Sequence, residues 1–367
     1  MPEPGRAAGL DGLVRIATRA SALALAQSRI VEAGLLAAWP GLEVALVGVV
    51  TEGDRRRDLS AAQLGGKGVF TAAVQQAVLE GRADLAVHSA KDLPAAQTPG
   101  LALAAVPERE DPRDVLVTAA TAAGGSGGLS EVARSRALAG LRSDEGATRE
   151  ASALSGGGPP SVSVRDPLDS LPTGSRVGTG SPRRVALLSW LRPDLEVRPL
   201  RGNVDTRVGK VVAGELDAAV LAASGLRRLG LAAATAGFLD PEVFTPAPGQ
   251  GCLAVEARED DQRVLALLAG LTHERSRTAL AGERAFLARL GGSCTLPAGA
   301  LLTIMADGSL ELRGFVAALD GKGLVRERLT GPAGDPEGLG RALADHLLAA
   351  CGPEVREVIE ANARQDR

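Results

Sequence analysis

The feature that most constrains the fold of this chain is an internal repeat. Residues 81–87 (GRADLAV) match residues 214–220 (GELDAAV) in the placement of their glycine, aspartate and apolar residues. Residues 16–21 (IATRAS) likewise match residues 177–181 (VGTGS), with one residue fewer. Each unit has the pattern of a buried strand, a small polar turn and a helix. The sequence therefore predicts two similar α/β lobes with a cleft between them.

The first repeat ends in a charged pair that the second repeat lacks. Residues 85–87 suit a short buried strand, Lys91 and Asp92 follow it, and Pro94 prevents the strand from continuing. Ligands of open α/β sheets bind at the carboxyl ends of strands, so the pair is either ligand-facing or an ordinary solvated turn. The corresponding strand of the second lobe leads into residues 222–225 (AASG). Because the scaffold is duplicated and the carboxylate is not, the asymmetry favours Asp92 as a catalytic group.

Composition excludes several classes of protein. Aromatic residues make up 2% of the chain, tyrosine is absent and the net charge is −3, which argues against base-stacking platforms and a basic face for nucleic acid. Three cysteines without paired spacing argue against a disulfide framework or a zinc site, and favour a reducing compartment. Residues 1–11 lack the pattern of a secretory signal, and no apolar run reaches the roughly 18 to 20 residues that span a bilayer. We expect a cytoplasmic protein with no metal.

Arginines gather where the strands of the second lobe are predicted to end. They are Arg183, Arg184, Arg201, Arg207 and the pair Arg227-Arg228. Such residues are often solvated helix faces. Their repeated placement at strand-to-helix junctions instead favours a polyanion site, since guanidinium groups pair with carboxylates and helix N-termini add backbone donors.

The domain organisation follows from these patterns. We predict the lobe arrangement of periplasmic binding proteins, two lobes with a hinge, plus a small C-terminal α+β domain. The first lobe would comprise residues 13–110 and 250–270, the second residues 113–245, and the third domain residues 272–352, with a charged tail over 353–367. Residues 119–166 have the composition of a largely disordered insertion, with a possible helix at 129–141. Asp307-Gly308 and Asp320-Gly321 predict two hairpins.

A glycine-rich loop precedes a predicted helix in the first lobe. Residues 65–68 (GGKG) lack the spacing of a P-loop and the Ser or Thr after its lysine. The loop is better interpreted as a mobile lid that carries the cation Lys67.

Cys294 alone would be interpreted as an inert, half-buried thiol. Its surroundings, residues 283–299, resemble the cofactor-attachment sequence of the porphobilinogen deaminase (hydroxymethylbilane synthase) family. The resemblance extends over nearly the whole chain. The other matching stretches are residues 15–21 (RIATRAS), 65–70 (GGKGVF), 87–94 (VHSAKDLP), 108–114 (EREDPRD), 181–184 (SPRR), 200–207 (LRGNVDTR), 225–230 (GLRRLG) and 248–251 (PGQG).

The resemblance implies three domains and a dipyrromethane cofactor, one per chain, bound by a thioether to Cys294. It also implies a transferase of porphyrin and heme biosynthesis. Four porphobilinogen molecules would be condensed head to tail onto the cofactor with loss of ammonia. Hydrolysis would then release hydroxymethylbilane, the linear tetrapyrrole, for hand-off to uroporphyrinogen-III synthase.

Roles for individual residues follow from the resemblance together with their chemistry. Asp92 would be catalytic, because a carboxylate facing a pyrrole N–H stabilises the positive charge that develops as ammonia leaves, and it would help to move the proton lost from the attacked carbon. The expected cofactor ligands besides Cys294 are Lys91, Arg183, Arg184, Ser181 and Thr179. The expected substrate ligands are Arg19, Ser21, Lys67, Arg201, Arg207 and Gln250.

Three positions depart from the family pattern: Gln63 replaces a lysine, Gly180 a small hydroxyl residue, and Ser293 a glycine. None of them changes Asp92 or Cys294. The repeated lobes alone would equally suit a non-catalytic small-anion binding protein or the effector domain of a regulator. The absence of a helix-turn-helix pattern and the extra domain with Cys294 argue against both. We expect a monomer, since no exposed apolar helix stripe is evident.

Overall fold

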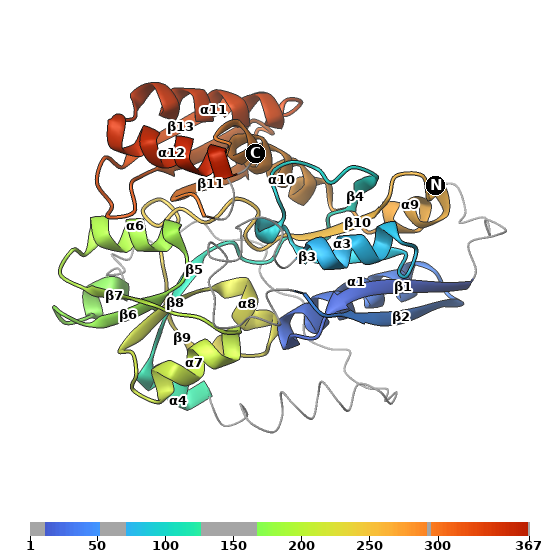
Figure 1. The fold of residues 1–367 in the computed structure, drawn as a ribbon, viewed down its shortest axis with the longest axis horizontal. Coiled ribbons are helices and arrows are strands. Elements are labelled where there is room, and N and C mark those ends of the chain that lie inside the picture. Colours follow the sequence, from blue (N-terminus) through green and yellow to red (C-terminus); the bar gives the residue numbers. More distant parts are fainter. Residues whose placement is uncertain (1–11, 52–70, 126–166, 292–294, 366–367) are drawn as a thin grey trace.

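The computed structural model describes residues 12–51, 71–125, 167–291 and 295–365. Their strands form two five-stranded sheets and one three-stranded sheet. Figure 1 shows the two larger sheets in separate lobes, with the C-terminal domain above them. The mixed α/β fold of two lobes and a small third domain agrees with the prediction.

The first lobe is a sheet of order β2-β1-β3-β10-β4. Its strands are β1 (Gly12–Arg19), β2 (Leu42–Val49), β3 (Leu85–Ser89), β4 (Leu101–Ala105) and β10 (Leu253–Arg258). β1 is parallel to β2 and β3, whereas β10 is antiparallel to β3 and β4. The helices of this lobe are α1 (Ala22–Ala38), α3 (Ala72–Leu79) and α9 (Gln262–Ala269). Ser21 caps α1 as predicted, because its Oγ accepts from the Ala24 N–H at 3.3 Å.

The second lobe repeats this topology in the order β7-β6-β8-β5-β9. Its strands are β5 (Asp114–Thr118), β6 (Arg176–Thr179), β7 (Glu196–Pro199), β8 (Ala218–Ala222) and β9 (Thr235–Phe238). Its helices are α4 (Ala119–Gly125), α6 (Pro182–Leu191), α7 (Val204–Val212) and α8 (Ala223–Arg228), and three short 3₁₀ turns in the two lobes are η1 (Ala90–Asp92), η2 (Pro167–Ser170) and η3 (Ala232–Ala234). β6 is parallel to β7 and β8, and β5 is antiparallel to β8.

An equivalent ion pair in each lobe confirms the repeat. Arg15 of β1 donates its backbone N–H and its guanidinium to Asp84, which stands just before β3. Arg176 of β6 makes the same contacts with Asp217, just before β8. Both aspartates also donate their backbone N–H to the arginine carbonyl. The position-for-position match of the two sequences is therefore a match of strand register.

The chain passes between the lobes twice. β5 follows β4 along the chain but lies in the second sheet, and β10 follows β9 but lies in the first. Each lobe thus receives one antiparallel strand after a crossing, and the predicted return of the chain before β10 is confirmed. The two crossings are residues 106–113 and 239–252, and each of them connects the two lobes.

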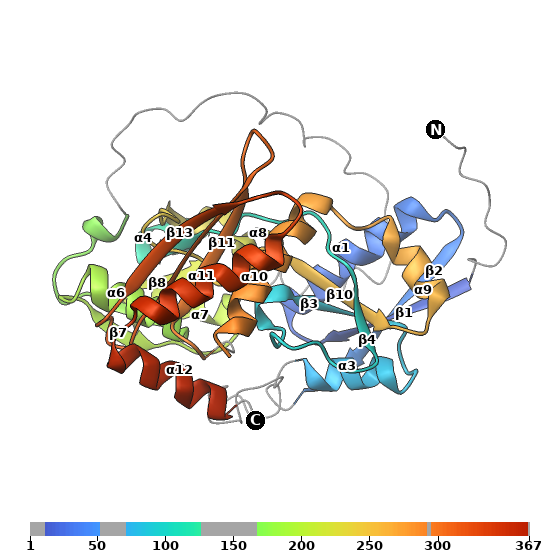
Figure 2. The ribbon, with the colours of Figure 1, turned by 90° about the horizontal axis from the view of Figure 1, so that it is seen from above.

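The C-terminal domain packs three helices with an antiparallel sheet of order β11-β12-β13 (Figure 2). Its strands are β11 (Ala298–Ile304), β12 (Leu310–Val316) and β13 (Val325–Gly331), and its helices are α10 (Glu274–Arg289), α11 (Pro336–Ala350) and α12 (Pro353–Gln365). Both predicted hairpins form. Phe315 and Ala317 pack into the core of the second lobe, so this domain and that lobe share apolar contacts.

Two segments differ from expectation. Residues 119–125, which we placed in the disordered insertion, form α4, and Ala122 is fully buried in the core of the second lobe. Residues 353–365, which we interpreted as a charged tail, form α12, whose Val355 and Ile359 are buried in the core of the C-terminal domain. The possible helix at 129–141 lies outside the described residues. Over the described ranges, none of the helices has the length and apolar character needed to cross a membrane.

Candidate functional site

The carboxyl ends of the parallel strands of both lobes meet at a pocket. Its lining comes from α1, the turn after β3, α6, α7, α8 and the second crossing. Four of the lining residues are cations: Lys91, Arg184, Arg207 and Arg228. No acidic side chain from the described part of the chain lines the pocket. An enclosed site with cations from both lobes is suited to a ligand that carries several negative charges.

Asp92 stands at the end of β3, in the 3₁₀ turn η1. Its side chain is exposed, and within the described part of the chain its carboxylate has neither a hydrogen-bond nor an ion-pair partner. Its negative charge acts on Lys91 and on Arg207 of the opposite lobe. Asp92 is not itself among the residues that line the pocket, but its neighbour Lys91 is, and both cations on which its charge acts line the pocket.

Lys91 is half-buried beside the second crossing. Its Nζ donates to Gln250 Oε1 at 3.2 Å. Burial, reinforced by the positive charge of Arg184, lowers the pKa of Lys91 from 10.5 to about 8, against the opposing effect of Asp92 and Asp114. The charge of this lysine is therefore easier to remove than that of an exposed lysine.

A buried carboxylate, Asp114, binds both predicted arginines of α6. Arg183 Nη2 lies 2.7 Å from Asp114 Oδ2, and Arg184 Nη2 lies 2.7 Å from Asp114 Oδ1. Gln250 Nε2 donates to Asp114 Oδ1 at 2.9 Å and to the Pro112 carbonyl at 2.7 Å. Burial alone would raise the pKa of Asp114, but the two guanidinium groups outweigh it and hold the pKa at about 2.

The two arginines that Asp114 binds differ in their position relative to the pocket. Arg184 lines the pocket, whereas Arg183 does not and also donates to the Thr245 carbonyl at 2.8 Å. Burial lowers the pKa of Arg183. The side-chain amide of Gln250 donates to two protein oxygens, those of Pro112 and Asp114, and its Oε1 accepts from Lys91. Gln250 therefore links residues of the two lobes.

Of the other predicted residues, Arg207 is the one that the described lining of the pocket contains. Arg207 of α7 lines the pocket, and burial together with Arg184 lowers its pKa to about 10. Thr179 is buried at the end of β6, where its Oγ1 accepts from the Ser181 N–H at 3.3 Å. Arg19 is the last residue of β1, Ser21 is the N-cap of α1, and Arg201 is exposed before α7. Lys67 and Cys294 lie outside the described residues.

Most of the pocket residues have no role in the predicted site, and Arg228 was predicted only as one of the arginines of a polyanion site. Arg228 of α8 lines the pocket and donates to the Gly251 carbonyl at 2.6 Å. Gln27 Nε2 donates to Ser89 Oγ at 2.7 Å, and both residues line the pocket. Arg228 had a sequence signal, since it follows a strand of the second lobe, but its neighbour Arg227 has the same signal and pairs instead with Glu110.

A second buried ion pair joins the C-terminal domain to the crossings. Glu283 of α10 accepts from Arg109 Nη1 at 2.6 Å and Nη2 at 3.0 Å. The same carboxylate accepts from the backbone N–H of Gly249 at 2.6 Å and of Leu302 at 2.9 Å. One fully buried side chain thus connects both crossings with β11 of the third domain.

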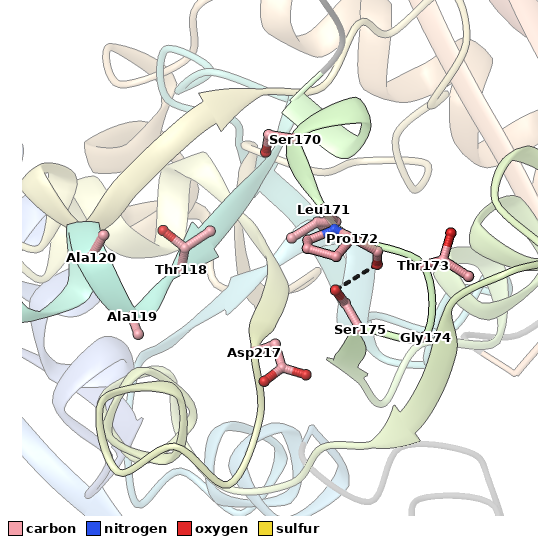
Figure 3. A pocket seen from close by; sticks show the side chains of 10 residues that line it. All are labelled: Thr118, Ala119, Ala120, Ser170, Leu171, Pro172, Thr173, Gly174, Ser175 and Asp217. Atoms are coloured by element: carbon pink, nitrogen blue, oxygen red, sulfur yellow. Dashed lines mark hydrogen bonds between the residues drawn. The ribbon is translucent and has the colours of Figure 1, made fainter.

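Another pocket lies at the opposite end of the second sheet (Figure 3). It is lined by the end of β5, by residues 170–175 and by Asp217. Among the described lining residues Asp217 is the one ionisable group, and it is already paired with Arg176 at 2.8 Å. Ser175, drawn in Figure 3, donates to the Pro172 carbonyl at 2.6 Å. The described lining of this pocket contains neither a cation nor any of the predicted site residues, so we exclude it as the site for an anion.

Comparisons with known proteins identify the family of this chain. The family model "Porphobilinogen deaminase, dipyromethane cofactor binding domain" matches residues 14–139 and 159–266, and "Porphobilinogen deaminase, C-terminal domain" matches residues 278–349. A protein of Roseiflexus sp. (strain RS-1) named porphobilinogen deaminase is 45% identical over 91% of this chain and 95% of its own length. One of Syntrophus aciditrophicus with that name is 41% identical over 95% of this chain and 99% of its own.

Likeness to a solved structure is much weaker. The BvgS VFT2 domain of Bordetella pertussis covers 74% of this chain and 92% of its own at 16% identity and a TM-score of 0.36, too low to bear on fold or function. The family models, by contrast, cover both lobes and the third domain, and the curated relatives match nearly end to end. The chain therefore belongs to the porphobilinogen deaminase family.

Proposed function

We propose that this chain is a hydroxymethylbilane synthase, which condenses four porphobilinogen molecules with loss of ammonia onto a covalent dipyrromethane and releases the linear tetrapyrrole. The observation that carries the proposal is the interlobe pocket, with cations from both lobes and no described acidic lining residue, together with the exposed Asp92, whose charge acts on two of those cations. A non-catalytic anion-binding protein would share the cations. It would have no use for a nearby carboxylate that has no partner among the described residues.

The residues present fit the cofactor of this family. Each pyrrole ring carries an acetate and a propionate, so a two-ring group brings four carboxylates into the cleft. Lys91, Arg184, Arg207 and Arg228 supply four lining cations from the two lobes. Burial already lowers the pKa of Lys91, Arg207 and Arg228. The lowered pKa values mean that burial of these positive charges is unfavourable. Carboxylates bound there would offset this unfavourable burial by pairing with the cations.

The attachment point we propose is Cys294. Of the other two cysteines, Cys252 lines the pocket, but burial raises the pKa of its thiol to about 11. It therefore stays protonated and is a poor nucleophile at neutral pH. Cys351 is buried in the core of the C-terminal domain. Neither is placed to compete for the cofactor.

We assign the chemical step to Asp92. When bound, the dipyrromethane would supply the nucleophilic pyrrole carbon of the condensation. As the C–N bond breaks and ammonia leaves, positive charge spreads to the pyrrole nitrogen of the substrate. A carboxylate oxygen of Asp92 would accept the hydrogen bond of that N–H and stabilise the charge. It is also available to take the proton that the attacked carbon loses.

The cations have a different task, which is to orient the ligand. Arg184 is held by Asp114 and by the Val220 carbonyl at 2.9 Å, so its guanidinium is fixed before a ligand arrives. Arg207 Nε donates to the Gly202 carbonyl at 2.8 Å. Groups fixed in this way lose little freedom on binding, which favours precise positioning of the reacting carbons.

Intact mass tests the proposal most directly. The full chain, expressed with ample precursor and purified, is expected to exceed its sequence mass by one dipyrromethane and to react with acidified Ehrlich reagent. The Cys294→Ala variant, prepared alongside, should have the bare sequence mass. A bare mass for the unmodified chain would exclude the proposed enzyme, and a gain of mass by Cys294→Ala would exclude Cys294 as the attachment point.

The rate at which porphobilinogen loads the apoprotein should depend on pH, because Lys91 loses its charge in the accessible pH range. Its folded pKa of about 8 lies below 10.5, so the ammonium is present below pH 8 and is lost as pH rises through that value. The rate at which porphobilinogen loads the apoprotein, followed by intact mass, should fall between pH 7 and 9. At pH 9 about one lysine in ten stays charged, so the fall is up to about tenfold.

The matched control is Lys91→Arg, because a guanidinium stays charged over this range. Each protein is normalised to its own rate at pH 7, which removes differences in side-chain shape. Titration of the attacking thiol and of the substrate amine affects both proteins alike. Superimposable pH profiles would contradict the role of the Lys91 charge.

The expected location, oligomeric state and product hand-off stay predictions. We propose that the enzyme acts as a cytoplasmic monomer and that hydroxymethylbilane is passed to uroporphyrinogen-III synthase. Analytical ultracentrifugation of the loaded chain measures the first of these, with a single species of about the sequence mass of 37.3 kDa as the expected result.

A further inference from the structure

Helix α12, the segment that reads as a charged tail in the sequence, is anchored in the C-terminal domain. Val355 and Ile359 are buried in the same apolar cluster as Leu290 and Leu296. Leu290 ends α10, and Leu296 precedes β11. These two residues stand on either side of the segment that contains Cys294. The apolar side of α12 therefore belongs to the same core as the residues that flank that segment.

A hydrogen bond links α12 to the residue that follows Cys294. Thr295 Oγ1 donates to Asn362 Oδ1 at 2.5 Å. Asn362 Nδ2 in turn donates to the Val358 carbonyl at 3.1 Å, which fixes the orientation of the amide and directs its oxygen toward Thr295. Both Thr295 and Asn362 are half-buried. A shielded hydrogen bond with a pre-oriented acceptor is a specific attachment.

The other flank is in close contact with the next residue of the helix. Gly291 has φ +64°, and a Cβ added there would lie 3.2 Å from the Cβ of Ala363. A side chain at this position would therefore meet α12 as well as a strained backbone conformation. Successive residues of one helical turn, Asn362 and Ala363, thus contact Thr295 and Gly291.

We propose that α12 is a positioning element for cofactor attachment, with Asn362 as its key residue. The inference rests on the proposed attachment at Cys294. In that reaction the thiol sulfur forms a bond to the aminomethyl carbon of porphobilinogen, the C–N bond breaks, and the thiol proton leaves with the amine as ammonium. Cys294 is peptide-bonded to Thr295, so an anchored Thr295 fixes the chain one residue from the proposed attachment point. A reacting group whose chain neighbour is anchored reacts at a higher effective concentration than one on an unanchored chain.

The test is the rate at which porphobilinogen loads the full-length apoprotein, measured as the fraction of chains that gain mass over time. Asn362→Ala removes the acceptor, and because alanine is a better helix former than asparagine, α12 itself is not weakened. Thr295→Val removes the donor at nearly constant volume. Each variant should load about fivefold more slowly, the factor that matches a hydrogen bond of ordinary net strength. Since both remove the same bond, the double variant should be no slower than Thr295→Val alone.

Arg364→Ala is the matched control on the same helix. Arg364 is exposed and its described partner is Glu360, 3.7 Å away on the same face, so loading should keep the unmodified rate. Thermal unfolding of each apoprotein is measured in parallel. Normal loading by Asn362→Ala would overturn the proposal, as would equal slowing by Arg364→Ala or independent effects of the two single changes. A gain of mass by Cys294→Ala would be a different failure, that of the attachment point.

Discussion

Asp92→Asn is expected to carry the dipyrromethane at full occupancy and to lose turnover by about 10²- to 10⁴-fold. The exposed carboxylate has no hydrogen-bond or ion-pair partner among the described residues, so its replacement breaks no internal contact there. An amide of the same shape keeps the volume and the polarity of the site. It removes the negative charge that stabilises the developing cation and the base that takes the proton.

Two measurements separate this result from a binding defect. Intact mass gives the cofactor occupancy, and steady-state kinetics give kcat and KM for porphobilinogen. The loss should lie in kcat, because Asp92 is assigned an interaction that forms as ammonia leaves. Asp92→Glu keeps the charge on a longer side chain and should recover part of the rate. Near-normal production of the tetrapyrrole by Asp92→Asn would remove Asp92 from its assigned role.

The fold could be predicted because its determinants are local. Short apolar runs that end in small polar turns recur at matched positions in the two lobes, and this pattern specifies strand, turn and helix without long-range information. The ion pairs Arg15–Asp84 and Arg176–Asp217 show that the match extends to register. The placement of Asp92 followed from the same reasoning, since the end of a parallel strand is a fixed location in such a sheet.

Asp114 could not be assigned from the sequence because its surroundings come from distant parts of the chain. A charged residue before a strand is usually solvated, and the sequence places Asp114 only in a stretch that resembles the family. Its burial depends on Arg183 and Arg184, 69 and 70 positions away, and on Gln250 from the second crossing. The predicted ligands Arg183 and Gln250 are for the same reason engaged within the protein.

Helix α12 was missed for a different reason. Its residues are mostly charged or polar, and this suggested a frayed tail. The sequence nevertheless contains the spacing of one helix face, at Val355, Val358, Ile359 and Asn362. This signal could have been recognised. The pattern has too few apolar positions to stand out, and its stability comes from the core that it joins.

Asp114→Asn is expected to lower the free energy of unfolding of the second lobe by about 3–5 kcal/mol. The aspartate is fully buried and is the counter-charge for two guanidinium groups at once. An asparagine keeps the size but leaves two buried positive charges without a negative partner. Urea unfolding followed by Trp190 fluorescence in a Trp39→Phe background reports on this lobe, because the chain has two tryptophans and Trp190 lies in α6.

Asp217→Asn is the matched control in the same sheet. Asp217 also pairs with an arginine, but both side chains are about two-fifths exposed, at 43% and 42%. Water and salt screen such a pair, so its loss should cost about 1 kcal/mol or less. Equal destabilisation by the two variants would contradict the claim that burial makes Asp114 important.

The difference in the free energy of unfolding between the unmodified chain and Asp114→Asn should depend on pH. This dependence provides a second, independent check. The folded pKa of Asp114 is about 2, below the ordinary value of 3.8, so its carboxylate stabilises the fold above pH 4 and this contribution is lost as pH falls toward 2. The shift corresponds to about 2 kcal/mol. The stability gap should therefore be constant from pH 7 to 5 and narrow by about that amount between pH 4 and 2. A gap that stays constant over the whole range would mean that Asp114 is not the ionised partner of Arg183 and Arg184.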